Sequence, residues 1–168
     1  MLRSLDVLIA MMHQVKLKKE NQLELMSGIK IFLADIKTKK KGYKLLSLIV
    51  SRYTLDQGIQ ELVQIHQELT PLMEGQSTKP RLRLIKAYVD QIKNFVVSQA
   101  NCPLEQVDGL LKHYIIELIT AMSNSNVKIR SIAQDIFTEI CTIMRVNFNS
   151  VNRLFTIILV GLSGKAST

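Results

Sequence analysis

Three histidines and two cysteines are the first side chains to consider as metal ligands, nucleophiles or bases. They are His13, His66, His113, Cys102 and Cys141. The histidines are separated by 53 and 47 residues, and His113 stands one helical turn from Glu117. No second His or Cys has the spacing of a zinc-ligand pair, the His-Glu-x-x-His motif is absent, and neither cysteine has a histidine near it in sequence. We therefore expect no metal site, no cofactor and no catalytic residue, and we interpret the chain as non-enzymatic.

The C-terminal segment 157–168 has a superficial likeness to a phosphate-binding loop, because an apolar run is followed by two glycines, a lysine and hydroxyl residues. A working loop needs the spacing Gly-x-x-x-x-Gly-Lys-Ser/Thr, so that backbone amides surround the phosphates and the hydroxyl binds Mg²⁺. Here Gly161 and Gly164 are three residues apart, and Ala166 takes the hydroxyl position. A helix that ends at a glycine explains the segment better than a nucleotide-binding enzyme built around Lys165.

Basic residues are in clear excess. Lys and Arg number 22 against 14 Asp and Glu, which gives a formal net charge of +8. Several clusters fall where helices are expected to begin, although the positive end of the helix dipole disfavours cations there. The candidates for contact with RNA or an acidic partner are Lys39, Lys40, Lys41, Lys44, Arg81, Arg83, Lys128 and Arg130.

Two interpretations of these clusters stay open. In the first, a base of each repeat pairs with an acid of the next, such as Asp56, Asp90 or Asp135, and forms a lateral ladder. In the second, the helix starts line up on one edge and form a stripe for phosphates. Such a stripe would release counterions on binding and give a salt-sensitive, sequence-independent affinity for nucleic acid.

Length and composition indicate one domain over residues 1–168, with 47% apolar residues and enough chain to bury about 70% of its unfolded surface. Two cysteines are too few for a disulfide framework, which favours a reducing compartment. The longest apolar run, 154–162, is shorter than the roughly 18 residues of a membrane span. Asp6 interrupts the apolar N-terminal stretch and argues against a signal peptide. We expect a soluble intracellular protein without membrane contact or a small-molecule substrate.

Apolar residues recur three and four positions apart, which predicts helices along the whole chain. In segment 104–122 one face carries Leu104, Val107, Leu111, Ile115, Leu118 and Met122. No alternating segment with hairpin turn pairs occurs, so the predicted fold class is all-α. The expected helices cover 2–18, 22–36, 39–53, 55–73, 80–98, 104–122, 127–146 and 150–162.

Residues that favour the first turn of a helix support these boundaries. Asn21 with Glu24 has capping-box spacing, as has the pair at 54 and 57, and Thr38 can cap a further helix. Pro80 and Pro103 suit first-turn positions. Segment 123–126 is polar and predicts a short turn between two helices.

The short connectors predict antiparallel neighbours, and the resulting helical hairpins repeat. Aligning Lys40, Arg81 and Arg130 gives spacings of 41 and 49 residues. These spacings are near the roughly 40–47 residues of HEAT and armadillo repeats. We therefore predict a HEAT/armadillo-like α-solenoid of three to four hairpins, with a plain helical bundle as its competitor. Neither the first helix nor the apolar segment 154–162 has an obvious partner, so we expect an excerpt of a longer array.

Several segments resemble, in the same order, the HEAT-repeat region of the ribosomal-RNA-processing protein twelve family. They read Thr38-Lys-Lys-Lys-Gly-Tyr-Lys-Leu-Leu, Lys79-Pro-Arg-Leu-Arg-Leu-Ile, Ile115-Ile-Glu-Leu-Ile-Thr-Ala-Met, Asn126-Val-Lys-Ile-Arg-Ser-Ile-Ala-Gln-Asp-Ile-Phe-Thr-Glu-Ile and Leu159-Val-Gly-Leu-Ser-Gly. The likeness spans about residues 25–164. Gly42 departs from it, since the family tends to have Ala there, and this weakens the helix by about 1 kcal/mol.

The resemblance implies a non-catalytic scaffold of small-subunit ribosome assembly, with association to pre-ribosomal RNA and assembly proteins. It also implies nuclear and nucleolar localisation and a part in subunit maturation and export. The alternative is a transport-receptor-like or other protein-interaction solenoid that binds acidic peptides without contacting RNA.

Overall fold

The computed structural model describes residues 2–14, 19–52, 60–69, 79–98, 104–148 and 151–163, and every regular element in these ranges is an α-helix. The eight helices are α1 (Leu2–Met12), α2 (Lys19–Ala34), α3 (Ile36–Arg52), α4 (Gln60–Leu69), α5 (Lys79–Ser98), α6 (Leu104–Met122), α7 (Val127–Phe148) and α8 (Val151–Ser163). The all-α prediction is confirmed, and each expected helix has a counterpart in the described ranges.

The start of α3 differs from the prediction. The helix begins at Ile36, and Asp35 caps it, because the Asp35 carboxylate accepts the backbone N–H of Lys37 at 3.1 Å. Thr38 therefore lies inside the helix, where its buried hydroxyl donates to the Phe32 carbonyl at 3.0 Å. The prediction of a Thr38 cap was wrong, since the Asp35 carboxylate accepts the Lys37 amide and the Asp35 carbonyl accepts the amides of Thr38 and Lys39.

Some of the other predicted helix boundaries agree with the structure and others do not. α2 begins at Lys19, so Asn21 lies within its first turn and the expected capping box is wrong. Pro80 is the second residue of α5, as predicted. The polar turn at 123–126 is confirmed, and its Asn126 carboxamide accepts the Lys128 N–H at 3.0 Å. The expected signals at positions 54, 57 and 103 lie outside the described residues.

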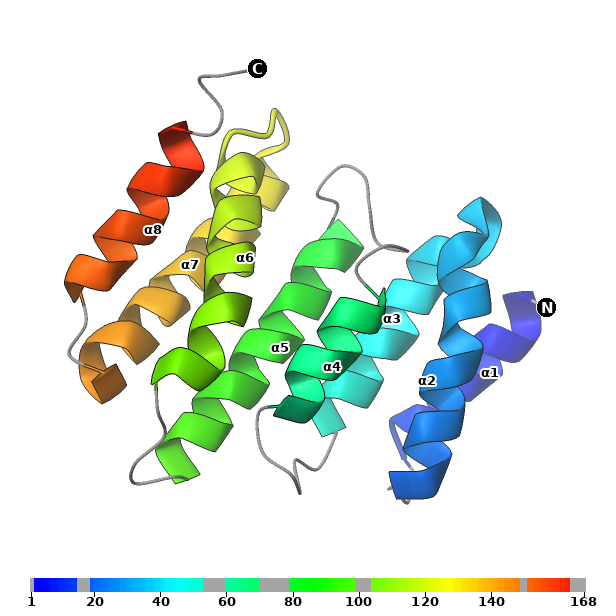
Figure 1. Ribbon diagram of the computed structural model, residues 1–168. Coiled ribbons are helices and arrows are strands. Elements are labelled where there is room, and N and C mark those ends of the chain that lie inside the picture. Colours follow the sequence, from blue (N-terminus) through cyan, green and yellow to red (C-terminus); the bar gives the residue numbers. More distant parts are fainter. Residues whose placement is uncertain are drawn as a thin grey trace.

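The helices form two rows (Figure 1). In the first row α1, α3, α5 and α7 lie side by side in chain order, with contacts from α1 to α3, from α3 to α5 and from α5 to α7. The second row, α2, α4, α6 and α8, covers one face of the first, and the chain reverses direction from each helix to the next. The beginnings of α3, α5 and α7 consequently lie along the same edge of the molecule (Figure 1).

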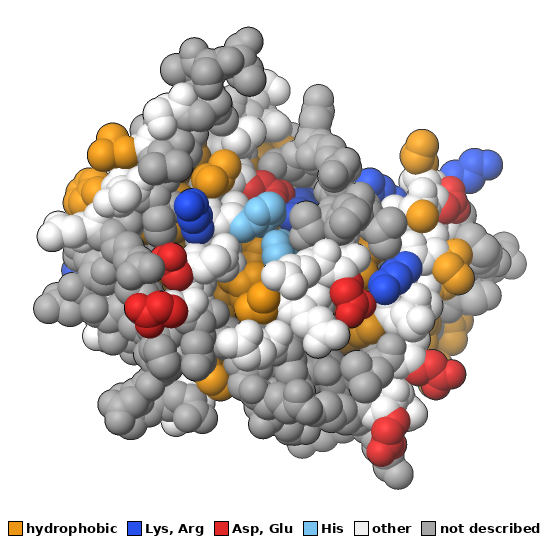
Figure 2. All heavy atoms as spheres, in the orientation of Figure 1, with side chains coloured by type: hydrophobic (Ala, Val, Ile, Leu, Met, Phe, Trp, Pro, Cys, Tyr) orange, Lys and Arg blue, Asp and Glu red, His pale blue; other side chains and the backbone are white. Residues whose placement is uncertain are grey.

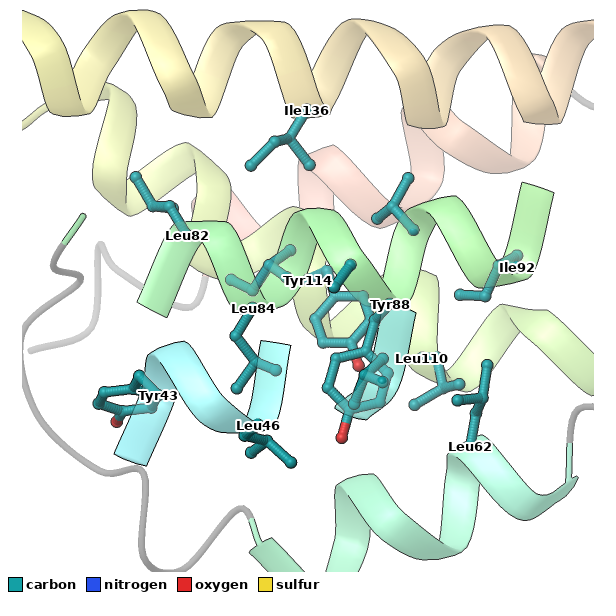
Figure 3. Close-up of a cluster of buried hydrophobic side chains, with 14 of the residues drawn as sticks. Tyr43, Leu46, Leu62, Leu82, Leu84, Tyr88, Ile92, Leu110, Tyr114 and Ile136 are labelled. Atoms are coloured by element: carbon teal, nitrogen blue, oxygen red, sulfur yellow. The ribbon is translucent and has the colours of Figure 1, made fainter. Parts of the chain in front are cut away.

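The core lies between the two rows and is organised around α5. Ten residues of α5 are buried, because α3 and α7 flank it within the row and α6 lies against it from the second row. Figure 3 shows Ile136 of α7 and Leu46 of α3 on two sides of α5, with Leu62 of α4 and Leu110 of α6 nearby. Each fully buried aliphatic side chain contributes about 1.5–3 kcal/mol, so this shared core holds the rows together.

None of the described helices is both long and apolar enough to cross a bilayer.

Candidate nucleic-acid interface

Charge is divided between the two rows. The helices of the first row carry 15 Lys and Arg against four Asp and Glu, a net charge of +11. Those of the second row carry four bases and seven acids, a net charge of −3. Figure 2 views the molecule from the side of the second row, where acidic, apolar and some basic side chains are visible among the described residues. A polyanion would therefore be attracted to the first row and not to the second.

Four of the predicted contact residues extend into solvent from the first row. Lys40, Lys44, Arg83 and Lys128 are exposed, and their side chains have no charged or hydrogen-bonding partner among the described residues. Lys40 and Lys44 are one turn apart on α3, while Arg83 and Lys128 lie near the beginnings of α5 and α7. Their positive charges are thus available to a ligand.

Two neighbouring lysines are already engaged. Lys41 is half-buried, and its ammonium lies 2.5 Å from a carboxylate oxygen of Asp6, so that it joins α3 to α1. Lys39 is half-buried as well and has an interaction within the fold. These two lysines therefore add to the positive charge of the first row but are less available for direct contact with a ligand than the exposed bases.

The structure places Arg81 differently from what its predicted role as a contact to RNA or an acidic partner requires. Its side chain is 7% exposed, and its Nε and Nη2 atoms donate to the two carboxylate oxygens of Glu117 at 2.9 Å each. Burial alone lowers the pKa of Arg81, but the hydrogen bonds and charge of Glu117 outweigh it, and the pKa is raised. Arg81 lies inward because position 81 belongs to the buried side of α5, so it is an internal tie to α6 and not a phosphate contact.

Arg130 is also committed to the fold. Its guanidinium donates to the carbonyl oxygens of Asn124 and Ser125 at 2.8 and 2.9 Å. These carbonyls belong to the turn between α6 and α7, and the contact stabilises that turn. Arg130 is half-buried and is therefore a structural residue first.

Ion pairs do join neighbouring helices of the first row, but none of the predicted acids that the structure describes takes part in one. Glu139 of α7 accepts Lys86 at 2.6 Å and Lys93 at 3.0 Å, and both lysines come from α5. Asp90 pairs with Lys86 of its own helix, whereas Asp135 is exposed without a partner among the described residues. Asp56 lies outside the described residues. Ladder and exposed bases thus coexist in the first row.

A second polar cluster, which the sequence did not indicate, lies where α4, α5 and α6 meet. The rings of His66 and His113 have centroids 4.8 Å apart, and Nδ1 of His66 lies 3.2 Å from the Tyr114 hydroxyl. Figure 2 shows histidine side chains together near the middle of the second-row face. The two residues are 47 positions apart on different helices, so only the packing of α4 against α6 reveals the pair.

Tyrosines form the floor of this cluster. Tyr88 and Tyr114 are fully buried with ring centroids 5.7 Å apart, and Figure 3 shows both hydroxyls on the side away from α7. The Tyr88 hydroxyl has no hydrogen-bond partner among the residues that the structure describes, and burial raises its pKa. Within the described ranges no group of three His, Cys, Asp or Glu side chains is arranged to hold a metal ion.

Comparison of the chain with protein-family models, with curated proteins and with solved structures finds no match.

Proposed function

We propose that this chain is a non-catalytic HEAT/armadillo-like scaffold whose first helix row binds the phosphate backbone of RNA. The observation that carries the proposal is the division of charge, +11 on the first row against −3 on the second, together with the exposed unpaired bases. The sequence resemblance supplies the kind of RNA, pre-ribosomal RNA of the small subunit, and with it ribosome-assembly proteins as further partners and the nucleolus as the location.

Two features support the solenoid assignment. The same lateral packing recurs from α1 to α3, from α3 to α5 and from α5 to α7, as expected for repeated hairpins stacked in series. In addition, side chains of one helix cap the end of the previous one in the row. Arg52 of α3 donates to the His13 carbonyl at 2.9 Å, and Gln91 of α5 donates to the Val50 carbonyl at 2.8 Å.

The terminal helices favour an excerpt of a longer array. α1 exposes Val7 and Met11, one turn apart, at 59% and 54%. α8 exposes Phe155 and Leu159, also one turn apart, at 60% and 65%. In the interior of the row, α5 has such lateral positions covered by its neighbours. Further helical hairpins stacked on α1 and α8 would bury these pairs in the same way.

The expected binding is electrostatic. Lys40, Lys44, Arg83 and Lys128 can each neutralise a phosphate, and each neutralised phosphate of a single strand adds about −0.7 to the slope of log affinity against log salt. The buried tyrosines cannot stack on bases, so we expect little discrimination between sequences.

A matched pair of charge reversals tests the proposal. Lys44→Glu and Lys112→Glu change the net charge equally, and both positions are exposed, but Lys44 lies on the first row and Lys112 on α6 of the second. Fluorescence anisotropy with a labelled single-stranded RNA, at salt concentrations from about 50 to about 300 mM, measures the affinity and the slope of log affinity against log salt.

We expect Lys44→Glu to lower the affinity by about tenfold and to reduce the slope, and Lys112→Glu to change both less. Equal effects of the two variants would show that only total charge matters and would contradict the assignment to the first row. Competition between the RNA and an acidic peptide distinguishes the alternative function. Binding of the peptide that RNA does not displace, together with no measurable RNA affinity, would identify a protein-interaction solenoid instead.

A further inference from the structure

Bases of the first row are gathered at one end of three neighbouring helices. The first five residues of α3, α5 and α7, which are 36–40, 79–83 and 127–131, include eight Lys or Arg and no Asp or Glu. These three segments, which we call the basic band, lie along the same edge of the molecule (Figure 1). The band therefore contains no carboxylate that could neutralise it from within.

Three bases of the band are used inside the fold. Arg81 is bonded to Glu117, Arg130 is bonded to the turn between α6 and α7, and Lys39 is half-buried with an interaction of its own. The side chains of the other five are exposed, and they are Lys37, Lys40, Lys79, Arg83 and Lys128. Each of the three helices thus presents at least one cation of the band to the solvent.

The exposed cations spread in two directions. Along α3, Lys37, Lys40 and Lys44 follow one another three and four residues apart, so they share one side of the helix and cover about 10 Å of its axis. Across the row, α3 packs against α5, and α5 packs against α7. Because packed helix axes are about 8–10 Å apart, the axes of α3 and α7 are separated by roughly 16–20 Å.

This spread fits two phosphate strands better than one. A protein that holds a single strand without sequence preference does so along one positively charged track that follows the backbone. A double helix presents the phosphates of both strands on either side of a groove. RNA duplexes are recognised mostly by shape and by contacts to phosphates and 2′-hydroxyls across the minor groove. Cations on α3 and on α7 can therefore contact different strands of one duplex.

The aromatic residues of the first row lead to the same conclusion. Proteins that bind single strands stack the bases on aromatic rings, which contributes about 1–3 kcal/mol per base. In the first row Tyr43 and Tyr88 are buried, and Phe95 and Phe137 are partly buried against the core. None of the aromatic side chains described in α1, α3, α5 and α7 is exposed. The bases of a duplex are already stacked on one another and need no such rings.

We propose that the basic band recognises double-helical RNA and prefers a duplex to a single strand. This inference rests on the proposed function, since it names the form of RNA that the first row binds. Recognition through phosphates and 2′-hydroxyls leaves the base sequence unread, in keeping with the electrostatic binding expected above.

Competition at equal phosphate concentration tests this preference in the unmodified protein. The probe is a fluorescently labelled RNA duplex of mixed sequence and about 16 base pairs, the length that double-stranded-RNA-binding domains span. Either the same duplex without label or oligouridylate, a single strand that does not fold on itself, is then added, and the loss of anisotropy is followed. We expect the duplex to displace the probe at a phosphate concentration about tenfold lower than oligouridylate does, because its second strand adds phosphate contacts.

Variants at the two ends of the band test whether one duplex spans it. Lys40→Gln on α3 and Lys128→Gln on α7 should each lower the duplex affinity by about fivefold. Each should also reduce the slope of log affinity against log salt by about 0.9, the contribution of one phosphate of a double helix. Lys112→Gln, at an exposed position of α6 in the second row, is the matched control and should change both less.

The possible failures are distinguishable. Oligouridylate that competes as well as the duplex, or better, would overturn the inference and leave the RNA-binding role in place. An unchanged duplex affinity in Lys128→Gln would also overturn it, because the contact would then not extend to α7. Absence of binding to both RNAs would instead refute the proposed function itself.

Discussion

Arg81 and Glu117 join α5 to α6 through two parallel hydrogen bonds of 2.9 Å, with only 7% and 18% of their side chains exposed. The geometry matches the planar guanidinium to the planar carboxylate, which is the strongest form of such a pair. Its position in the core, beside His66 and Tyr43, makes it a determinant of both packing and local electrostatics.

Removing one partner of this pair should be strongly destabilising. Arg81→Met would leave the Glu117 carboxylate largely buried without its counter-charge, and we expect a loss of about 3 kcal/mol in the free energy of unfolding. Urea denaturation at pH 7 measures it. The double variant Arg81→Met, Glu117→Met should be more stable than Arg81→Met alone, because no buried charge remains unpaired.

Arg83→Met is the matched control, since Arg83 lies on the same helix but is exposed. We expect it to change the free energy of unfolding by less than about 0.5 kcal/mol. Similar losses for Arg81→Met and Arg83→Met would contradict the structural role assigned to Arg81.

Arg81 and Arg83 also show which property could not be predicted from the sequence. They are two residues apart and identical in type, and both belong to a basic cluster at a helix start. Because α5 is covered by neighbours on several sides, its buried arc extends to position 81 as well as to Leu82 and Leu84. That extension depends on which helices flank α5, and such tertiary information is absent from local periodicity.

The helices themselves were predictable because periodicity and turn composition are local properties. The helix boundaries were less predictable, because Asp35 and Thr38 are both competent caps and the structure uses Asp35. The division of charge between the rows follows from the sequence once the alternation of helices is known. The His66–His113 contact does not, since it requires the relative placement of α4 and α6.

The two fully buried tyrosines, Tyr88 and Tyr114, should respond differently to loss of the hydroxyl group. Tyr114→Phe removes the partner of His66 Nδ1 and should lower the free energy of unfolding by about 1 kcal/mol. Tyr88→Phe removes a buried hydroxyl that has no partner in the described part of the chain, and it should be neutral or stabilising. Thermal denaturation of both variants compares them directly. A larger loss for Tyr88→Phe than for Tyr114→Phe would refute this assignment of partners.

Glu139 should stabilise the contact between α5 and α7 through Lys86 and Lys93. Burial tends to raise the pKa of Glu139, but the hydrogen bonds and charges of the two lysines lower it overall. The unfolded chain therefore binds more protons at mildly acidic pH. The stability that Glu139 contributes is present above its ordinary pKa and is lost as the pH falls through the lowered one.

Glu139→Gln should thus cost about 1 kcal/mol at neutral pH, and less at high salt or at acidic pH, because the lysines are partly exposed and screened. Asp135→Asn, on the same helix without a partner among the described residues, should change stability much less. Denaturant titrations at two salt concentrations measure both variants. A loss in Glu139→Gln that is independent of salt and pH would argue against an electrostatic origin.

Three helical glycines should separate into two classes when replaced by alanine. A Cβ at Gly28 or Gly109 meets no other atom within 4 Å, so each alanine should stabilise the protein by about 0.5–1 kcal/mol through helix propensity alone. A Cβ at Gly42 would lie 3.2 Å from a Leu33 methyl and 3.3 Å from the Phe32 backbone carbon. Since the backbone of α2 cannot easily move, Gly42→Ala should gain less than the other two or be destabilising. The glycine then reflects the close approach of α2 and α3, and a gain at Gly42 equal to that at Gly28 would mean that this approach is looser than the contacts indicate.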